Sequence, residues 1–73
     1  MIIDKTNQAY RFEVGDGSQV VYPAQAILFI TNDNSDSVNV RLKASRKNVL
    51  TFNYKDVTNY SATSAADLVK QLL

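Results

Sequence analysis

The sequence predicts an α+β protein in which a small antiparallel sheet of four or five strands, built from hairpins, is closed by one short C-terminal helix. Strands are indicated by apolar residues at every second position, most clearly in residues 38–44. The helix is indicated by Ser64-Ala65-Ala66-Asp67, which has the spacing of a helix N-cap, and by the apolar stripe that follows it. At 73 residues, the chain is expected to form a single domain, residues 1–73.

The first half of the chain predicts one hairpin and one apolar strand. Residues 1–3 can form an edge strand or a free arm. Residues 9–14 and 18–22 are expected to pair around Gly15-Asp16-Gly17, because glycine supplies the positive φ angles of a tight turn. The next segment, residues 24–31, is apolar on both faces. This pattern predicts either a central strand or a strand that is covered on each face, where the helix could cover one side and a second protomer the other.

Residues 38–56 predict a second hairpin, which follows a polar turn at residues 32–37. On both of its strands, the alternation directs one set of apolar side chains towards the core. The inward set is Val38, Val40, Leu42 and Ala44 on the first strand, and Leu50, Phe52 and Tyr54 on the second. The turn between the two strands is expected at residues 45–48.

The outward side chains of this second hairpin are strongly basic. Residues 41–55 contain five cations and no acid, although the net charge of the whole chain is only +1. The five cations are Arg41, Lys43, Arg46, Lys47 and Lys55. One interpretation is a solvated sheet face whose charges discourage aggregation through strand edges. The other is a binding surface for an acidic partner or for nucleic acid, which holds phosphates through such cations.

Catalysis, a cofactor and a metal site are not expected. The chain contains no histidine and no cysteine, so it lacks the commonest general base, the thiol nucleophile and the usual zinc ligands. Its acids show no spacing that pairs two carboxyl groups for acid–base chemistry. Asp33, Asn34 and Asp36 match a fragment of a calcium loop, but the required glycine and the final glutamate are missing.

Self-association is expected, because a chain of this length forms only a small core and has no disulfide to support it. The helix stripe of Leu68, Val69, Leu72 and Leu73 can dock on the chain's own sheet or form a subunit contact. No apolar run approaches the length of a membrane span, and residues 1–8 do not resemble a signal peptide. The expected location is therefore the cytoplasm of the producing cell. Later incorporation into a virion is the second location that is compatible with this expectation.

The series of strands that ends in residues 52–60 (FNYKDVTNY), followed by residues 61–73 (SATSAADLVKQLL), resembles small proteins encoded by tailed bacteriophages. This resemblance of pattern covers residues 26–73 and implies a non-enzymatic structural or assembly role, with other protein subunits as partners. The order of four strands and a helix is also similar to the single-strand-binding transcription-cofactor family related to the PUR and Whirly proteins. That similarity implies, as the alternative, a nucleic-acid-binding module that uses residues 41–55.

The aromatic residues of the second hairpin do not fit the alternative function. Proteins that bind single strands place exposed aromatic side chains among their basic residues, so that bases can stack on them. Here Phe52 and Tyr54 share the inward face of Leu50, whereas Lys55 is expected to face outward. The structural or assembly role is therefore the leading expectation from the sequence.

Overall fold

The computed structural model describes residues 1–33 and 36–73. These residues form two small sheets and one α-helix. In chain order, the elements are β1 (Ile2–Lys5), β2 (Ala9–Glu13), β3 (Gln19–Pro23), η1 (Ala24–Ala26), β4 (Ile27–Asn32), β5 (Ser37–Leu42), β6 (Leu50–Asn53), η2 (Tyr54–Asp56) and α1 (Ala65–Leu72). Strands β1-β2-β3 form the N-terminal sheet, and strands β4-β5-β6 form the C-terminal sheet. All strand pairs in both sheets are antiparallel.

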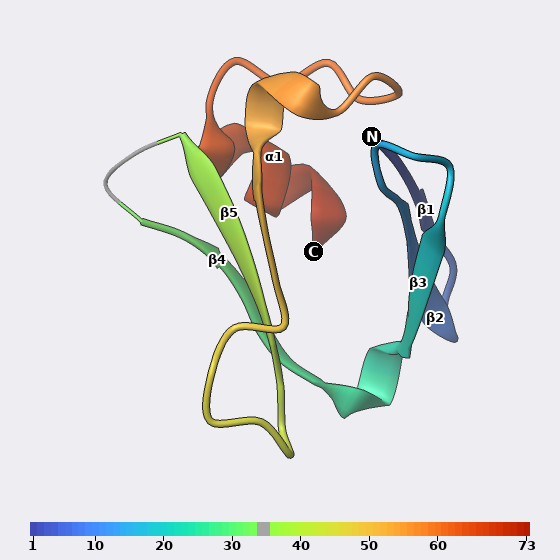
Figure 1. Ribbon diagram of the computed structural model, residues 1–73. Helices are drawn as coiled ribbons and strands as arrows, with labels where there is room; N and C mark the ends of the chain where they lie inside the picture. The colour runs from blue at the N-terminus through green and yellow to red at the C-terminus, as the bar shows by residue number, and fades with distance from the viewer. Residues whose placement is uncertain (34–35) are drawn as a thin grey trace.

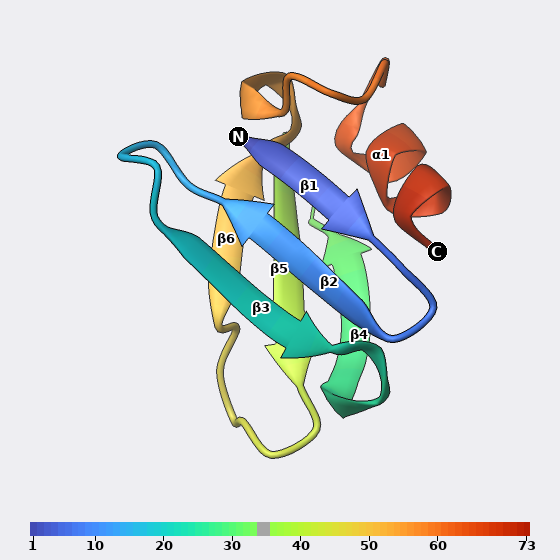
Figure 2. The same ribbon diagram turned by 90° about the vertical axis from the view of Figure 1, so that its right-hand side faces the viewer.

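The two sheets lie face to face, and α1 packs at one open side between them (Figures 1 and 2). This arrangement confirms the predicted α+β class, the antiparallel pairing and the C-terminal helix. It differs from the prediction of a single sheet of four or five strands. The reason lies at Pro23, which ends β3, and in the short helix η1 that follows it and leads the chain across to the second sheet.

Aromatic and aliphatic side chains from both sheets fill the space between them. Phe12 of β2 is fully buried, and its ring centroid lies 5.9 Å from that of Phe52 on β6. Tyr10 and Tyr22 flank Phe12 within the N-terminal sheet. The inward positions predicted for the second hairpin are confirmed for Val38, Val40 and Phe52, which are buried, whereas Ala44 is exposed.

Strand β4 lies at the edge of the C-terminal sheet, so the alternative of a central strand is wrong for this segment. Within the described residues, β4 is hydrogen-bonded to β5 alone. The register shifts between Ile27 and Phe29, which makes Leu28 an additional residue, as in a β-bulge. Ile27 and Ile30 therefore both contact the core although they are three positions apart, while 52% of Leu28 and 36% of Phe29 are exposed.

The helix α1 begins at the predicted cap. The Ser64 hydroxyl accepts a hydrogen bond from the Asp67 backbone N–H at 3.0 Å, and the Asp67 carboxylate accepts one from the Thr63 N–H at 3.0 Å. At the other end of α1, the Tyr10 hydroxyl donates to the carbonyl oxygen of Leu72 at 2.6 Å. The helix is thus fixed at its start by a local cap and at its end by the N-terminal sheet.

The outer edge of β1 is covered by residues 56–59. The side-chain amide of Asn59 accepts from the Ile3 N–H at 3.0 Å and donates to the Ile3 carbonyl oxygen at 2.8 Å. The Thr58 N–H donates to the carbonyl oxygen of Met1 at 2.9 Å. The first residues therefore belong to an edge strand and do not form a free arm. Backbone groups of Met1 and Ile3 on its outer edge are hydrogen-bonded to residues 58 and 59.

The outer edge of β3 has no such cover within the described residues. The bonds from Val14 N to Ser18 O and from Ala24 N to Gln8 O fix which positions of the hairpin face β2. Because ladder bonds recur at every second residue, the backbone groups of Gln19, Val21 and Pro23 point away from β2. Pro23 therefore removes no bond from the ladder, as expected for proline on an edge strand.

Three features bear on the remaining expectations. The turn predicted at residues 32–37 and the calcium-loop fragment both include residues that lie outside the described part of the chain, at positions 34 and 35. Among the described residues, no group of three or more metal-ligating side chains comes together. No helix in residues 1–33 or 36–73 has the length and apolar character needed to cross a membrane.

Candidate interaction surface

The apolar stripe of α1 is used mainly inside the chain. Leu68, Val69 and Leu72 are buried against the two sheets, whereas 74% of Leu73 is exposed. Of the four residues named as a candidate subunit contact, only Leu73 therefore lies at the surface. The other three residues pack within the chain itself, as in the alternative of docking on the chain's own sheet.

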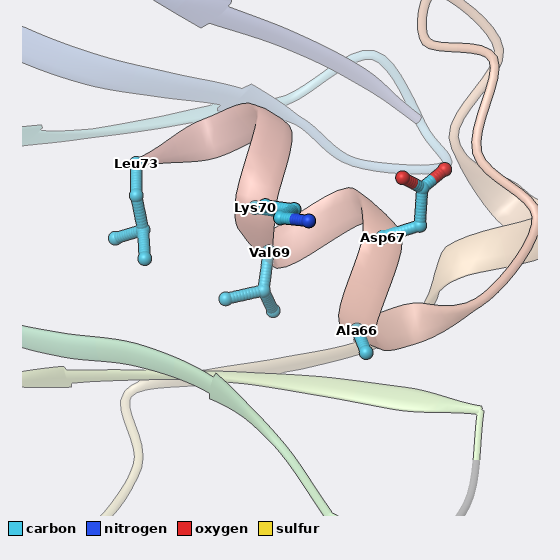
Figure 3. A pocket seen from close by; sticks show the side chains of 5 residues that line it. All are labelled: Ala66, Asp67, Val69, Lys70 and Leu73. Carbon is cyan, nitrogen blue, oxygen red and sulfur yellow. The ribbon is translucent and has the colours of Figure 1, made fainter.

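A shallow groove of about 480 Å³ lies beside this helix and is lined by Ala66, Asp67, Val69, Lys70 and Leu73. Figure 3 shows Ala66, Val69 and Leu73 pointing from one side of α1 towards the C-terminal sheet, while the Asp67 carboxylate points to the opposite side of the helix. Its floor is apolar, and the two charges at its rim have opposite sign. The groove brings together no set of groups that suits a charged ligand or a reaction.

The five basic residues of the second hairpin do not form one continuous array. Lys55 lies in η2 rather than on a strand, because the Asn53 side chain accepts the Lys55 backbone N–H at 2.9 Å and ends β6 there. Its ammonium group pairs with Asp36 at 3.3 Å. Since η2 follows β6 and the basic loop precedes it, Lys55 lies at the opposite end of the strand from Arg46 and Lys47.

Residues 43–49 form the loop between β5 and β6, which we call the basic loop. Lys43, Arg46 and Lys47 are exposed, and they form no ion pair within the described residues. Backbone bonds fix both ends of the loop: Lys43 N to Ala26 O at 2.9 Å, and Val49 N to Val40 O at 2.8 Å. The fold thus presents three cations, unpaired among the described residues, on a loop whose ends are held by the sheet.

Arg41 extends this positive charge onto the outer face of the C-terminal sheet. It lies opposite Phe29 in the β4–β5 register, and its guanidinium carbon is 5.3 Å from the centre of the Phe29 ring. The Nε atom of Arg41 is buried without a hydrogen-bond partner. A buried donor of this kind is uncommon and costs about 1–3 kcal/mol until an acceptor reaches it.

Phe29 is the residue that sequence reasoning missed. The apolar pattern of residues 24–31 predicts cover on both faces and therefore no surface role for Phe29. The sequence thus indicates no aromatic side chain among the exposed cations. The bulge at Leu28 leaves Phe29 on the outer face, where it contacts Arg41. Phe29 could have been identified only through its pairing with Arg41 on the neighbouring strand. That pairing follows from the register of β4 and β5, which the sequence alone does not give.

Polar uncharged residues occupy the rest of this face. The registers place Thr31, Asn39 and Thr51 in one row across β4, β5 and β6, next to the pair of Phe29 and Arg41. The Thr51 hydroxyl donates to Asn39 Oδ1 at 2.9 Å. The three strands β4, β5 and β6 contain no acidic residue, so no carboxylate on the strands themselves opposes the positive charge of Arg41.

Two groups in the N-terminal half, Tyr10 and Asp16, have pKa values that depart from their ordinary values. Burial raises the pKa of the Tyr10 phenol, and the neighbouring Tyr60 adds a smaller effect in the same direction. Hydrogen bonds from the side chain and backbone of Ser18 lower the pKa of the Asp16 carboxyl. The candidate interaction surface thus combines exposed cations, one aromatic ring and polar uncharged groups.

No protein-family model, no curated protein sequence and no solved structure matches this chain.

Proposed function

We propose that this chain is a non-enzymatic binding protein whose basic loop and Arg41 hold a polyanionic partner. The observation that carries this proposal is the set of exposed cations Lys43, Arg46 and Lys47, which form no ion pair in the described parts of the chain. Cations without a partner in the folded chain remain available to an external polyanion. No acid lies among them, so the local potential is positive although the net charge is small.

Binding of this kind has a characteristic dependence on salt. Each anionic group that a lysine or arginine neutralises releases condensed counterions, so the affinity falls steeply as salt is added. Surface charges are also screened over a distance of about 10 Å at moderate ionic strength. A partner held by these cations is therefore expected to bind at low salt and to dissociate as the salt concentration rises.

The test is the affinity for polyphosphate, measured by calorimetry across a salt series. The double variant Lys43→Glu with Arg46→Glu should lose affinity by about tenfold or more, since it reverses two of the contacting charges. The matched control is Arg11→Glu with Lys70→Glu, which changes the net charge equally but lies on β2 and α1. Absence of binding by the unaltered chain at low salt, or equal losses in both double variants, would contradict the proposal.

A second candidate function is the self-associating structural or assembly protein that the sequence favoured. The uncovered edge of β3 supports it, together with Val21 on the same strand, of which 50% is exposed. An edge strand with free backbone groups and an exposed apolar side chain is a ready partner for a second copy. Light scattering over a concentration series measures this property directly.

A further inference from the structure

We infer that the polyanion is single-stranded nucleic acid and that it lies on the outer face of the C-terminal sheet, with its bases stacked at Phe29 and Arg41. The inference rests on the proposed function, because the same basic loop would hold the phosphates. It goes further in naming the chemistry of the partner, since a base has a flat π face that a simple polyanion lacks. The inference also gives a role to Phe29, Asn39 and Thr31, which are uncharged and would not contribute to simple charge attraction.

Phe29 and Arg41 together supply the surface on which a base stacks. The guanidinium carbon lies 5.3 Å from the ring centre, and 36% of Phe29 is exposed. Aromatic rings and the plane of an arginine side chain both stack on unpaired bases in single strands. A duplex keeps the faces of its bases against one another, so this contact requires a single strand or an unpaired end.

The row beside this pair supplies hydrogen bonds for the edge of a base. Asn39 accepts from Thr51 through Oδ1, and within the described residues its amide nitrogen donates to no other group. Thr31 lies beside Asn39 in the register, on the same side of the aromatic pair. Asn39 and Thr31 lie two residues from Arg41 and Phe29 along their strands, a distance of about 7 Å. The polar groups thus lie close enough to contact the stacked base or its neighbour.

The basic loop continues the path from the sheet face. Lys43 lies two residues beyond Arg41, and Arg46 and Lys47 follow it in the loop. Phosphates that accompany a base at Phe29 would therefore meet these cations on leaving the face.

An acidic peptide is the competing partner for a surface with unpaired cations. Its carboxylates could pair with Lys43 and Arg46, but it would gain little from the aromatic character of Phe29. The dependence of binding on the ring therefore separates the two partners. Polyphosphate serves as the reference ligand, since it has the charges of a nucleic-acid backbone and no bases.

The experiment compares fluorescence-anisotropy titrations of labelled oligo(dT), oligo(U) and the matching duplex with the affinity for polyphosphate. Phe29→Leu keeps an apolar side chain but removes the ring, and Phe29→Trp keeps a stacking surface. Arg41→Lys keeps the charge but removes the planar group. Val21→Leu on the outer face of the N-terminal sheet is the control, and circular dichroism establishes that each variant is folded.

Phe29→Leu and Arg41→Lys are each expected to weaken oligo(dT) or oligo(U) binding by about fivefold or more, the loss of one stacked base. Both variants should leave polyphosphate binding within about twofold, since the charge is unchanged. Phe29→Trp and the control should retain full affinity. A preference for oligo(U) would identify RNA, and a preference for oligo(dT) would identify DNA.

Two results would overturn the inference without affecting the proposed function. One is equal affinity for polyphosphate and single strands with no selective loss in Phe29→Leu and Arg41→Lys. The other is tight binding of an acidic peptide that oligo(dT) and oligo(U) do not displace. If neither polyphosphate nor any oligonucleotide binds at low salt, the proposed function fails and the inference fails with it.

Discussion

At the scale of the residue, the Tyr10 hydroxyl joins the N-terminal sheet to the end of the helix. It donates to the Leu72 carbonyl oxygen at 2.6 Å, and the side chain is buried. Burial disfavours the charged phenolate and so raises the pKa of Tyr10, and the neighbouring Tyr60 adds to this effect. The phenolate also cannot donate the bond to Leu72. A group whose folded pKa is above its unfolded value contributes stability that is lost as the pH rises past the unfolded value.

Tyr10→Phe is expected to lower the free energy of unfolding by about 1 kcal/mol near neutral pH, because it removes the hydrogen bond and leaves the Leu72 carbonyl oxygen unpaired. The variant should also lose less stability than the parent when the pH is raised above about 10. Tyr22→Phe is the control, since the Tyr22 hydroxyl forms no hydrogen bond among the described residues. Urea denaturation across alkaline pH measures both effects, and identical pH profiles for the two variants would contradict the expectation.

The same scale shows where single residues could be placed from sequence. Val38 and Val40 were correctly directed inward, because alternation alone decides the face of a regular strand. Phe29 was not, because the bulge at Leu28 breaks the alternation and no local pattern marks it. Its contact with Arg41 is a cross-strand relation. The candidate interaction surface was therefore predictable in its charge and not in its aromatic component.

At the scale of the element, α1 shows how a short helix is made stable. Eight residues are too few to hold a helix in water, so α1 depends on its cap and on its buried face. The Ser64 hydroxyl satisfies the Asp67 N–H, and Leu68 and Leu72 are fully buried. The sequence predicted this helix well, since both the cap and the stripe are encoded within ten residues, 64–73.

Ser64→Ala is expected to reduce the free energy of unfolding by about 1 kcal/mol, because it leaves an N–H group at the helix start without a partner. Ser61→Ala is the matched control: Ser61 accepts a bond from Gln71 through its backbone carbonyl, which the substitution keeps. Guanidinium denaturation followed by circular dichroism compares the two variants. Equal stability of both would show that the cap contributes little.

At the scale of the whole molecule, the sequence did not predict that the strands divide into two sheets. The strands were found, but which strands pair depends on contacts between distant residues. Residues 24–26 carry no pattern that distinguishes a helical crossover from a continued strand. The resulting sheets leave β3 uncovered at its outer edge within the described residues, which is the basis for expecting self-association.

Self-association is expected to appear as an average mass that rises with protein concentration in light scattering. Val21→Lys should reduce it, because a charge on an edge strand opposes pairing with a second copy. Ile2→Lys is the matched control, since Ile2 is an exposed apolar residue on the covered strand β1. A strict monomer at high concentration, or equal effects of the two lysines, would contradict the expectation.

The side-chain amide of Asn59 has a consequence for the symmetry of any assembly. By bonding both the N–H and the carbonyl of Ile3, it occupies the place that a further strand would take beside β1. Strand addition to the N-terminal sheet is then confined to β3. Two copies that meet at β3 use the same surface and exhaust it, so this sheet favours a closed two-fold pair over an open filament.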